Sequence, residues 1–177
     1  FPTRLGRIGV DLAVLTTCVV LISLGGIWIL PGVTAFLALD VVGIAARCVC
    51  GAPTVVSTRP RLADGTPFPT FYYLTHPAAT AAVSTLEAEG EMPGLAALLV
   101  DEVADAYRAA HTQYIADRES VGVVEEVNGI SAGGMPDLVK CSPALVGHAL
   151  AVGAGVNPIG DIALARAAWS PEVCECV

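Results

Sequence analysis

The longest uncharged stretch of the chain constrains its fold more than any other feature. No charged residue occurs from Leu12 to Leu39, and the nineteen residues of Leu12–Leu30 end at the helix-breaking pair Pro31-Gly32. A helix of that length spans about 30 Å, the thickness of the hydrocarbon core of a bilayer. Because few soluble helices are apolar on every face, this run predicts a transmembrane helix, with a buried core helix as the alternative.

The chain divides into two predicted parts around this run. Residues 1–40 form an N-terminal, membrane-associated segment, and residues 41–177 form a small domain. A membrane is therefore the predicted partner, through residues 12–30. Only 15% of the residues are charged, against about a quarter in ordinary globular proteins, which agrees with a part of the chain that avoids water.

Acidic residues dominate the middle of the chain. Between Glu87 and Glu126, ten acids stand against Arg108 and Arg118, and this segment accounts for the net charge of −8. Such a segment repels a phosphate backbone, so we expect no nucleic-acid partner. A solvated helix face is the simpler interpretation.

Turn residues and apolar spacing predict an α+β fold that is mainly helical, with one short antiparallel ribbon. The β-branched and aromatic residues at 54–58 and 70–75 predict the two strands of that ribbon. Prolines at helix starts and the spacing of apolar residues predict four helices in the domain. These helices cover residues 78–89, 93–119, 143–152 and 161–169.

Cysteine and histidine side chains supply the candidate chemistry, because thiolate and imidazole are ligands that zinc prefers. The candidate metal ligands are Cys48, Cys50, His76, Cys141 and His148. Turns beside Cys48, His76 and Cys141 can bring these distant stretches together, and Cys50 or His148 would complete four ligands. The simpler alternative is that Cys141 and His148 are packing residues of the core.

Two functions of different classes follow from these residues. The first is a structural or regulatory module at the membrane whose cysteine and histidine cluster binds zinc. The alternative is a small hydrolase or thiol-dependent enzyme that uses Cys141 and His148, although no third group that would orient them is evident. Whether the chain is an enzyme, which residues would be catalytic and whether it has a protein partner stay open.

Thiols that bind metal favour a reducing compartment. We therefore expect the protein at a membrane with residues 41–177 on the cytoplasmic side, and the alternative location is the cytoplasm itself.

Six motifs in a fixed order resemble the bacterial family catalogued as domain of unknown function 501, which is common in actinobacteria. They are Arg47–Pro53, Asp64–Pro77, Ala110–Tyr114, Ser131–Pro136, Val139–Cys141 and Gly155–Asp161. The resemblance covers residues 41–177 and implies no activity, because the family has none established. Members of the family often carry cysteine at the position of His76, and a zinc ligand position tolerates that exchange.

Overall fold

The computed structural model describes residues 40–173 and Cys176, all of which lie in one unit of the chain, residues 38–177. The predicted transmembrane helix, Leu12–Leu30, lies outside the described residues. No helix among residues 40–173 is long and apolar enough to cross a membrane.

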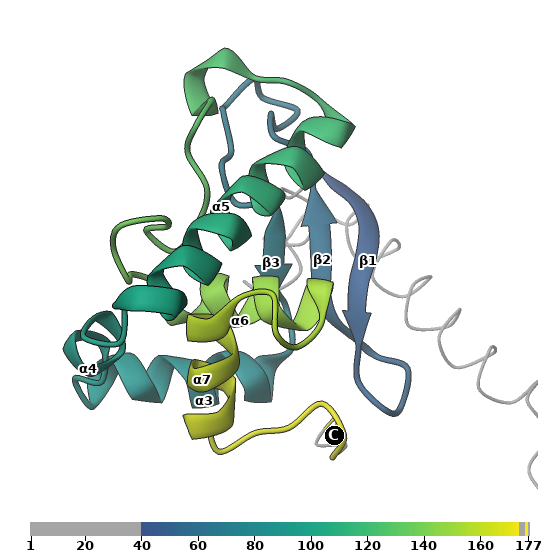
Figure 1. The fold of residues 1–177 in the computed structure, drawn as a ribbon. Helices are drawn as coiled ribbons and strands as arrows, with labels where there is room; N and C mark the ends of the chain where they lie inside the picture. The colour runs from purple at the N-terminus through teal and green to yellow at the C-terminus, as the bar shows by residue number, and fades with distance from the viewer. Residues whose placement is uncertain (1–39, 174–175, 177) are drawn as a thin grey trace, which may run out of the picture. The chain divides into compact units, whose positions relative to one another are not determined.

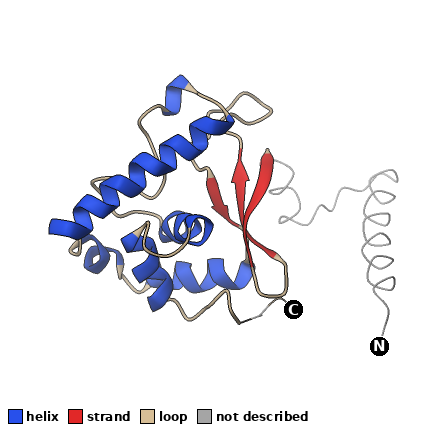
Figure 2. Cartoon of the chain, turned by 45° about the vertical axis from the view of Figure 1, so that its right-hand side comes forward, coloured by secondary structure: helices blue, strands red, loops and turns tan. Residues whose placement is uncertain are grey.

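The described part of the chain confirms the α+β class, with five α-helices and a three-stranded antiparallel sheet (Figure 1). The elements in chain order are β1 (Val41–Arg47), β2 (Pro53–Thr58), β3 (Tyr72–Leu74), α3 (Pro77–Ala88), α4 (Met92–Ala96), α5 (Asp101–Val121), the 3-10 helix η1 (Glu125–Val127), α6 (Ser142–Val152) and α7 (Pro158–Arg166). The helices gather on one side of the sheet (Figure 2).

The sheet has one strand more than the predicted ribbon. Its order is β1-β2-β3, with Val41 opposite Thr58 in the first pair and Val56 opposite Tyr73 in the second. Strand β1 has an apolar sequence like that of the preceding run, from which only Asp40 separates it, so composition alone does not predict a strand. Its pairing with β2 is what makes it a strand.

The predicted helix over residues 93–119 is wrong, because the structure divides it into α4 and α5. Helix α4 ends at Ala96, the chain is extended at Val100, and Asp101 has a φ of 45°. The break lets α4 turn so that Leu95 is fully buried, and it lets both helices contact α7. Apolar spacing continues across the break, so the sequence pattern alone does not reveal it.

Helix α6 is the centre of the domain, because it contacts all three strands as well as α3 and α7. Two glycines allow this close packing. A Cβ on Gly147 would lie 3.2 Å from the carbonyl oxygen of Tyr72, and one on Gly160 would lie 2.4 Å from the carbonyl oxygen of Leu145. Any larger residue at Gly160 would push α7 away from α6.

A buried arginine holds the segment that follows α5. The Arg118 side chain is 1% exposed, and its guanidinium donates hydrogen bonds to the carbonyl oxygens of Val127 and Ile130. Burial lowers the pKa of Arg118. Carbonyl oxygens of the loop thus solvate a cation that water cannot reach, and they fix the path of the chain after η1.

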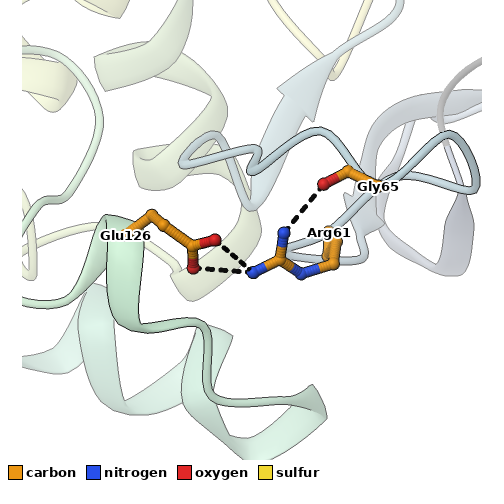
Figure 3. Close-up of polar contacts among 3 residues, drawn as sticks. All are labelled: Arg61, Gly65 and Glu126. Carbon is orange, nitrogen blue, oxygen red and sulfur yellow. Dashed lines mark hydrogen bonds and ion pairs between the residues drawn. The ribbon is translucent and has the colours of Figure 1, made fainter.

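An ion pair joins the loop after β2 to η1 (Figure 3). One nitrogen of Arg61 lies 2.7 Å and 2.6 Å from the two carboxylate oxygens of Glu126, and the other donates to the carbonyl oxygen of Gly65 at 2.8 Å. The hydrogen bond from Arg61 lowers the pKa of Glu126. Both side chains are exposed, so this pair positions the loop after β2 more than it stabilises the fold.

Candidate metal centre

A tight turn between β1 and β2 presents the first two thiols. The Cys48 N–H donates to the carbonyl oxygen of Ala52 at 2.8 Å, and the Gly51 N–H donates to that of Cys48 at 2.8 Å. Gly51 has a φ of +91°, which favours glycine at this position. The turn leaves Cys48 3% exposed, whereas Cys50 is exposed to solvent.

His76 lies at the junction of β3 and α3, where it is the N-cap residue of the helix. Its Nδ1 accepts a hydrogen bond from the Ala79 N–H at 3.3 Å, and Pro77 occupies the first turn. The imidazole is 3% exposed and packs against the ring of Trp169 with their centroids 5.1 Å apart. The cap and the indole together fix the direction of Nε2.

The third contributor, Cys176, follows α7 in the chain. After α7 the chain passes beside the β1–β2 turn, where the Val49 N–H donates a hydrogen bond to the carbonyl oxygen of Pro171 at 3.1 Å. That contact brings the segment back to the end of the sheet at which β1 stops. Cys176 is exposed.

The side chains from these three stretches meet. One ligand atom each from Cys48, His76 and Cys176 lies within 4.8 Å of the other two. Nε2 of His76 is 3.0 Å from Sγ of Cys176, and Sγ of Cys50 is 3.3 Å from the same sulfur. We call Cys48, Cys50, His76 and Cys176 the thiol–imidazole cluster. The group of Cys48, His76 and Cys176 could hold a metal ion.

Cys141 is not a member of this group. It is exposed and precedes α6 in the left-handed conformation, with a φ of 55°. The start of α6 is capped from another helix, because the carboxylate of Glu87 accepts hydrogen bonds from the Ser142 N–H at 2.6 Å and from its hydroxyl at 3.0 Å. Cys141 is thus the N-cap residue of α6, and its left-handed backbone conformation leads the chain into the helix.

His148 is also outside the group and lies fully buried in α6. Its ring stacks on Tyr72 at 5.6 Å and meets the edge of Tyr114 at 5.1 Å, and its Nδ1 is 3.2 Å from the side-chain nitrogen of Asn157. The amide donates that bond, because its oxygen accepts from the Gly160 N–H at 3.0 Å. We call Tyr72, Tyr114, His148 and Asn157 the aromatic cluster.

The aromatic cluster keeps its histidine neutral. Burial lowers the pKa of His148 to about 4, since no charged partner offsets the loss of hydration. Burial likewise raises the pKa of Tyr114 to about 12. The imidazole of His148 therefore acts as a neutral aromatic ring that packs between two tyrosines.

Of the five predicted ligands, the structure gathers Cys48 and His76 with Cys50 beside them, and it adds Cys176. The sequence contains a signal for this fourth residue. Cys174-Glu175-Cys176 repeats the Cys-x-Cys spacing of Cys48-Val49-Cys50, and paired thiols of one spacing at two places are typical of a shared site.

The comparisons with known proteins agree with the motifs. Residues 44–165 match the model of a family described as a protein of unknown function, DUF501. The chain belongs to the DUF501 family. Neither a curated protein nor a solved structure matches the chain. The DUF501 match contains Cys48, Cys50 and His76, and it ends before Cys176.

Proposed function

We propose that this DUF501 protein is a structural or regulatory module that binds zinc through the thiol–imidazole cluster and is attached to a membrane by residues 12–30. The observation that supports the metal is the approach of three ligand atoms from Cys48, His76 and Cys176 to within 4.8 Å of one another. Soft thiolates with one imidazole form a donor set that suits zinc.

The distances are close to those of a tetrahedral zinc site. Bonds of about 2.3 Å to sulfur and about 2.0 Å to nitrogen imply separations of about 3.8 Å between sulfurs and about 3.5 Å from sulfur to nitrogen. The distances from the Cys176 sulfur to the Cys50 sulfur, 3.3 Å, and to Nε2 of His76, 3.0 Å, need to widen by about half an ångström. Rotation of the exposed Cys176 side chain would supply that change, and we propose Cys50, whose sulfur lies 3.3 Å from that of Cys176, as the fourth ligand.

Zinc binding requires a proton to move within His76. The Nδ1 atom now accepts a hydrogen bond from the Ala79 N–H, so the ring proton is on Nε2. Coordination through Nε2 shifts that proton to Nδ1 and breaks the cap bond. Loss of the cap lowers the stability of the helix by about 1 kcal/mol. The free energy of zinc binding in zinc-finger peptides is larger, at about 10–16 kcal/mol. The metal therefore outweighs the cap.

Four protein ligands favour a structural or regulatory ion over a catalytic one, because a catalytic zinc keeps a position for water or substrate. Such an ion would tie the β1–β2 turn, the start of α3 and the segment after α7 together. The alternative enzyme, built on Cys141 and His148, has no support from the described contacts. His148 is fully buried with Nδ1 beside Asn157, and its Nε2 has no hydrogen-bond partner in the described part of the chain.

The test of the metal proposal is zinc content. Full-length protein, purified in detergent under reducing conditions, is expected to hold one zinc per chain by elemental analysis. Cys48→Ser and His76→Ala are expected to lose it, and Cys141→Ser is the matched control that keeps it. Wild-type protein without zinc, or equal zinc in Cys48→Ser, would refute the proposal.

Membrane attachment is tested separately, because it rests on the uncharged run alone. The full chain is expected in the membrane fraction after alkaline carbonate washing. Leu21→Arg places a charge near the centre of the run, which costs about 3 kcal/mol on insertion scales, and is expected to move protein to the soluble fraction. A wild-type chain that washes off as a monomer would contradict this attachment.

A further inference from the structure

We propose that Cys50 and Cys176 form a redox-active pair whose oxidation to a disulfide expels the metal ion. This inference rests on the proposed zinc site and concerns its regulation. The two sulfurs are 3.3 Å apart although the residues are separated by 126 positions in the chain. A disulfide bond is about 2.05 Å long, so the sulfurs must approach by about 1.3 Å.

Exposure selects this pair from the thiols of the cluster. Cys50 and Cys176 are both exposed, so a dissolved oxidant reaches them, whereas Cys48 is 3% exposed at the base of the turn. Cys50 lies within the β1–β2 turn. In the proposed step its exposed sulfur reacts with the oxidant, and the neighbouring sulfur of Cys176, 3.3 Å away, resolves the product.

The oxidant is a hydroperoxide. The Cys50 sulfur attacks one peroxide oxygen, an S–O bond forms as the O–O bond breaks, and the other oxygen leaves as an alcohol or water. The Cys176 sulfur then attacks the Cys50 sulfur, the S–S bond forms, the S–O bond breaks and water leaves. Two electrons pass from the two thiolates to the peroxide, and solvent supplies the two protons that these products need.

The disulfide removes the ion because both sulfurs lose the negative charge that makes them ligands. Cys48 and His76 remain, and two protein ligands hold zinc far more weakly than four. The ion leaves as Zn²⁺ with its oxidation state unchanged. Reduction of the disulfide restores the site.

The experiment treats zinc-loaded, full-length protein with hydrogen peroxide and follows zinc release with a chromophoric chelator. Wild type is expected to release one zinc as two thiols are lost, and mass spectrometry without reduction is expected to find Cys50 linked to Cys176. The mapping is done in a Cys174→Ser variant, so that a cross-link to the C-terminal peptide is assigned to Cys176 and not to Cys174. Dithiothreitol with added zinc is expected to restore the loaded form.

Two variants sharpen the result. In the Cys174→Ser background, Cys50→Ser is expected to form no intramolecular cross-link to Cys176 at equal peroxide. Cys141→Ser, which also removes an exposed thiol, is expected to form that cross-link and to release zinc like wild type. A cross-link that maps to another pair, or zinc that is released with both thiols intact, would overturn the inference.

The two proposals fail in distinguishable ways. Absence of zinc from the reduced protein refutes the proposed function, and mapping the cross-link in that metal-free protein still decides whether Cys50 and Cys176 form the pair. Stoichiometric zinc with no linkage between Cys50 and Cys176 refutes the redox inference and leaves the zinc site standing.

Discussion

His76 and His148 are almost equally buried, at 3% and 0% exposure, and each lies against an aromatic ring. Their ring nitrogens nevertheless face different groups. In the thiol–imidazole cluster Nε2 of His76 faces a thiol sulfur at 3.0 Å, whereas in the aromatic cluster Nδ1 of His148 faces an amide at 3.2 Å. Burial therefore does not distinguish a candidate ligand from a packing residue, but the atom beside each nitrogen does.

The two clusters also differ in how they join the chain. The thiol–imidazole cluster gathers a turn, the start of a helix and the segment after α7, and two of its four side chains are exposed. The aromatic cluster joins β3, α5 and α6 inside the core, where every atom has close neighbours. We expect the stability that the thiol–imidazole cluster provides to depend on metal and redox conditions. We expect the stability that the aromatic cluster provides to depend on side-chain volume and charge.

The largest expected effect separates the clusters by their dependence on zinc. At a free zinc concentration of about 1,000 times Kd, the ion adds about 4 kcal/mol to the free energy of unfolding, and a chelator removes that gain. We expect the chelator effect in urea unfolding to vanish in His76→Ala and to persist in His148→Phe. A chelator effect that persists in His76→Ala would show that this histidine is no ligand.

The next effect tests the aromatic cluster by volume. His148→Ala leaves a cavity between Tyr72 and Tyr114 and is expected to lower the free energy of unfolding by about 3 kcal/mol. Its zinc content, measured on the folded protein, should equal that of wild type. Loss of zinc without loss of stability would reverse the roles assigned to the two histidines.

The pH dependence of stability tests the charge state of His148. Its pKa is about 4 in the folded protein and about 6.5 in an unfolded chain, so between these values the unfolded state binds more protons. Stability is therefore full above about pH 6.5 and falls by about 2 kcal/mol from pH 7 to pH 5. Urea unfolding of metal-free protein measures the fall, and His148→Phe should lack this part of it. Equal slopes in the two proteins would contradict the assignment.

The smallest expected effect belongs to Cys141, which lies in neither cluster. Cys141→Ser should change the free energy of unfolding by less than about 0.5 kcal/mol, because the side chain is exposed. Zinc content should be unchanged. A fall to half the wild-type zinc or less would place Cys141 among the ligands, and the thiol–imidazole cluster would then need to be redefined.

Local signals predicted the ends of α3 and α6 well, whereas the helix predicted over residues 161–169 lies three residues earlier, at Pro158–Arg166. Pro77 and Gly90 placed α3 within one residue of its observed bounds, and Ser142-Pro143 did the same for α6. Both signals act through the backbone of the residues themselves, so no distant contact is needed. Strand β1 and the break before α5 depend on partners elsewhere in the fold, namely β2 and α7, and the sequence patterns there did not reveal them.

The candidate site was predicted in part for the same reason. Cys48, Cys50 and His76 lie beside turns that the sequence shows, and the structure gathers them. The neighbours of His148 were not foreseeable, because Tyr72 is 76 positions away and meets it only through the packing of α6 on β3. Cys176 repeats the Cys-x-Cys spacing, but only the path of the chain after α7 brings it to His76.

The 100 positions between His76 and Cys176 also set an order of events during synthesis. A ribosome adds about 5–20 residues per second, so roughly 5–20 s pass between the emergence of the two side chains. The sheet is synthesised before that interval, and α3 to α7 are synthesised within it, before Cys176 exists. Zinc that arrives early finds only the β1–β2 turn and His76, and the complete set of ligands forms after the core has been made. An ion held by this cluster would therefore bind only after the rest of the described domain has been synthesised.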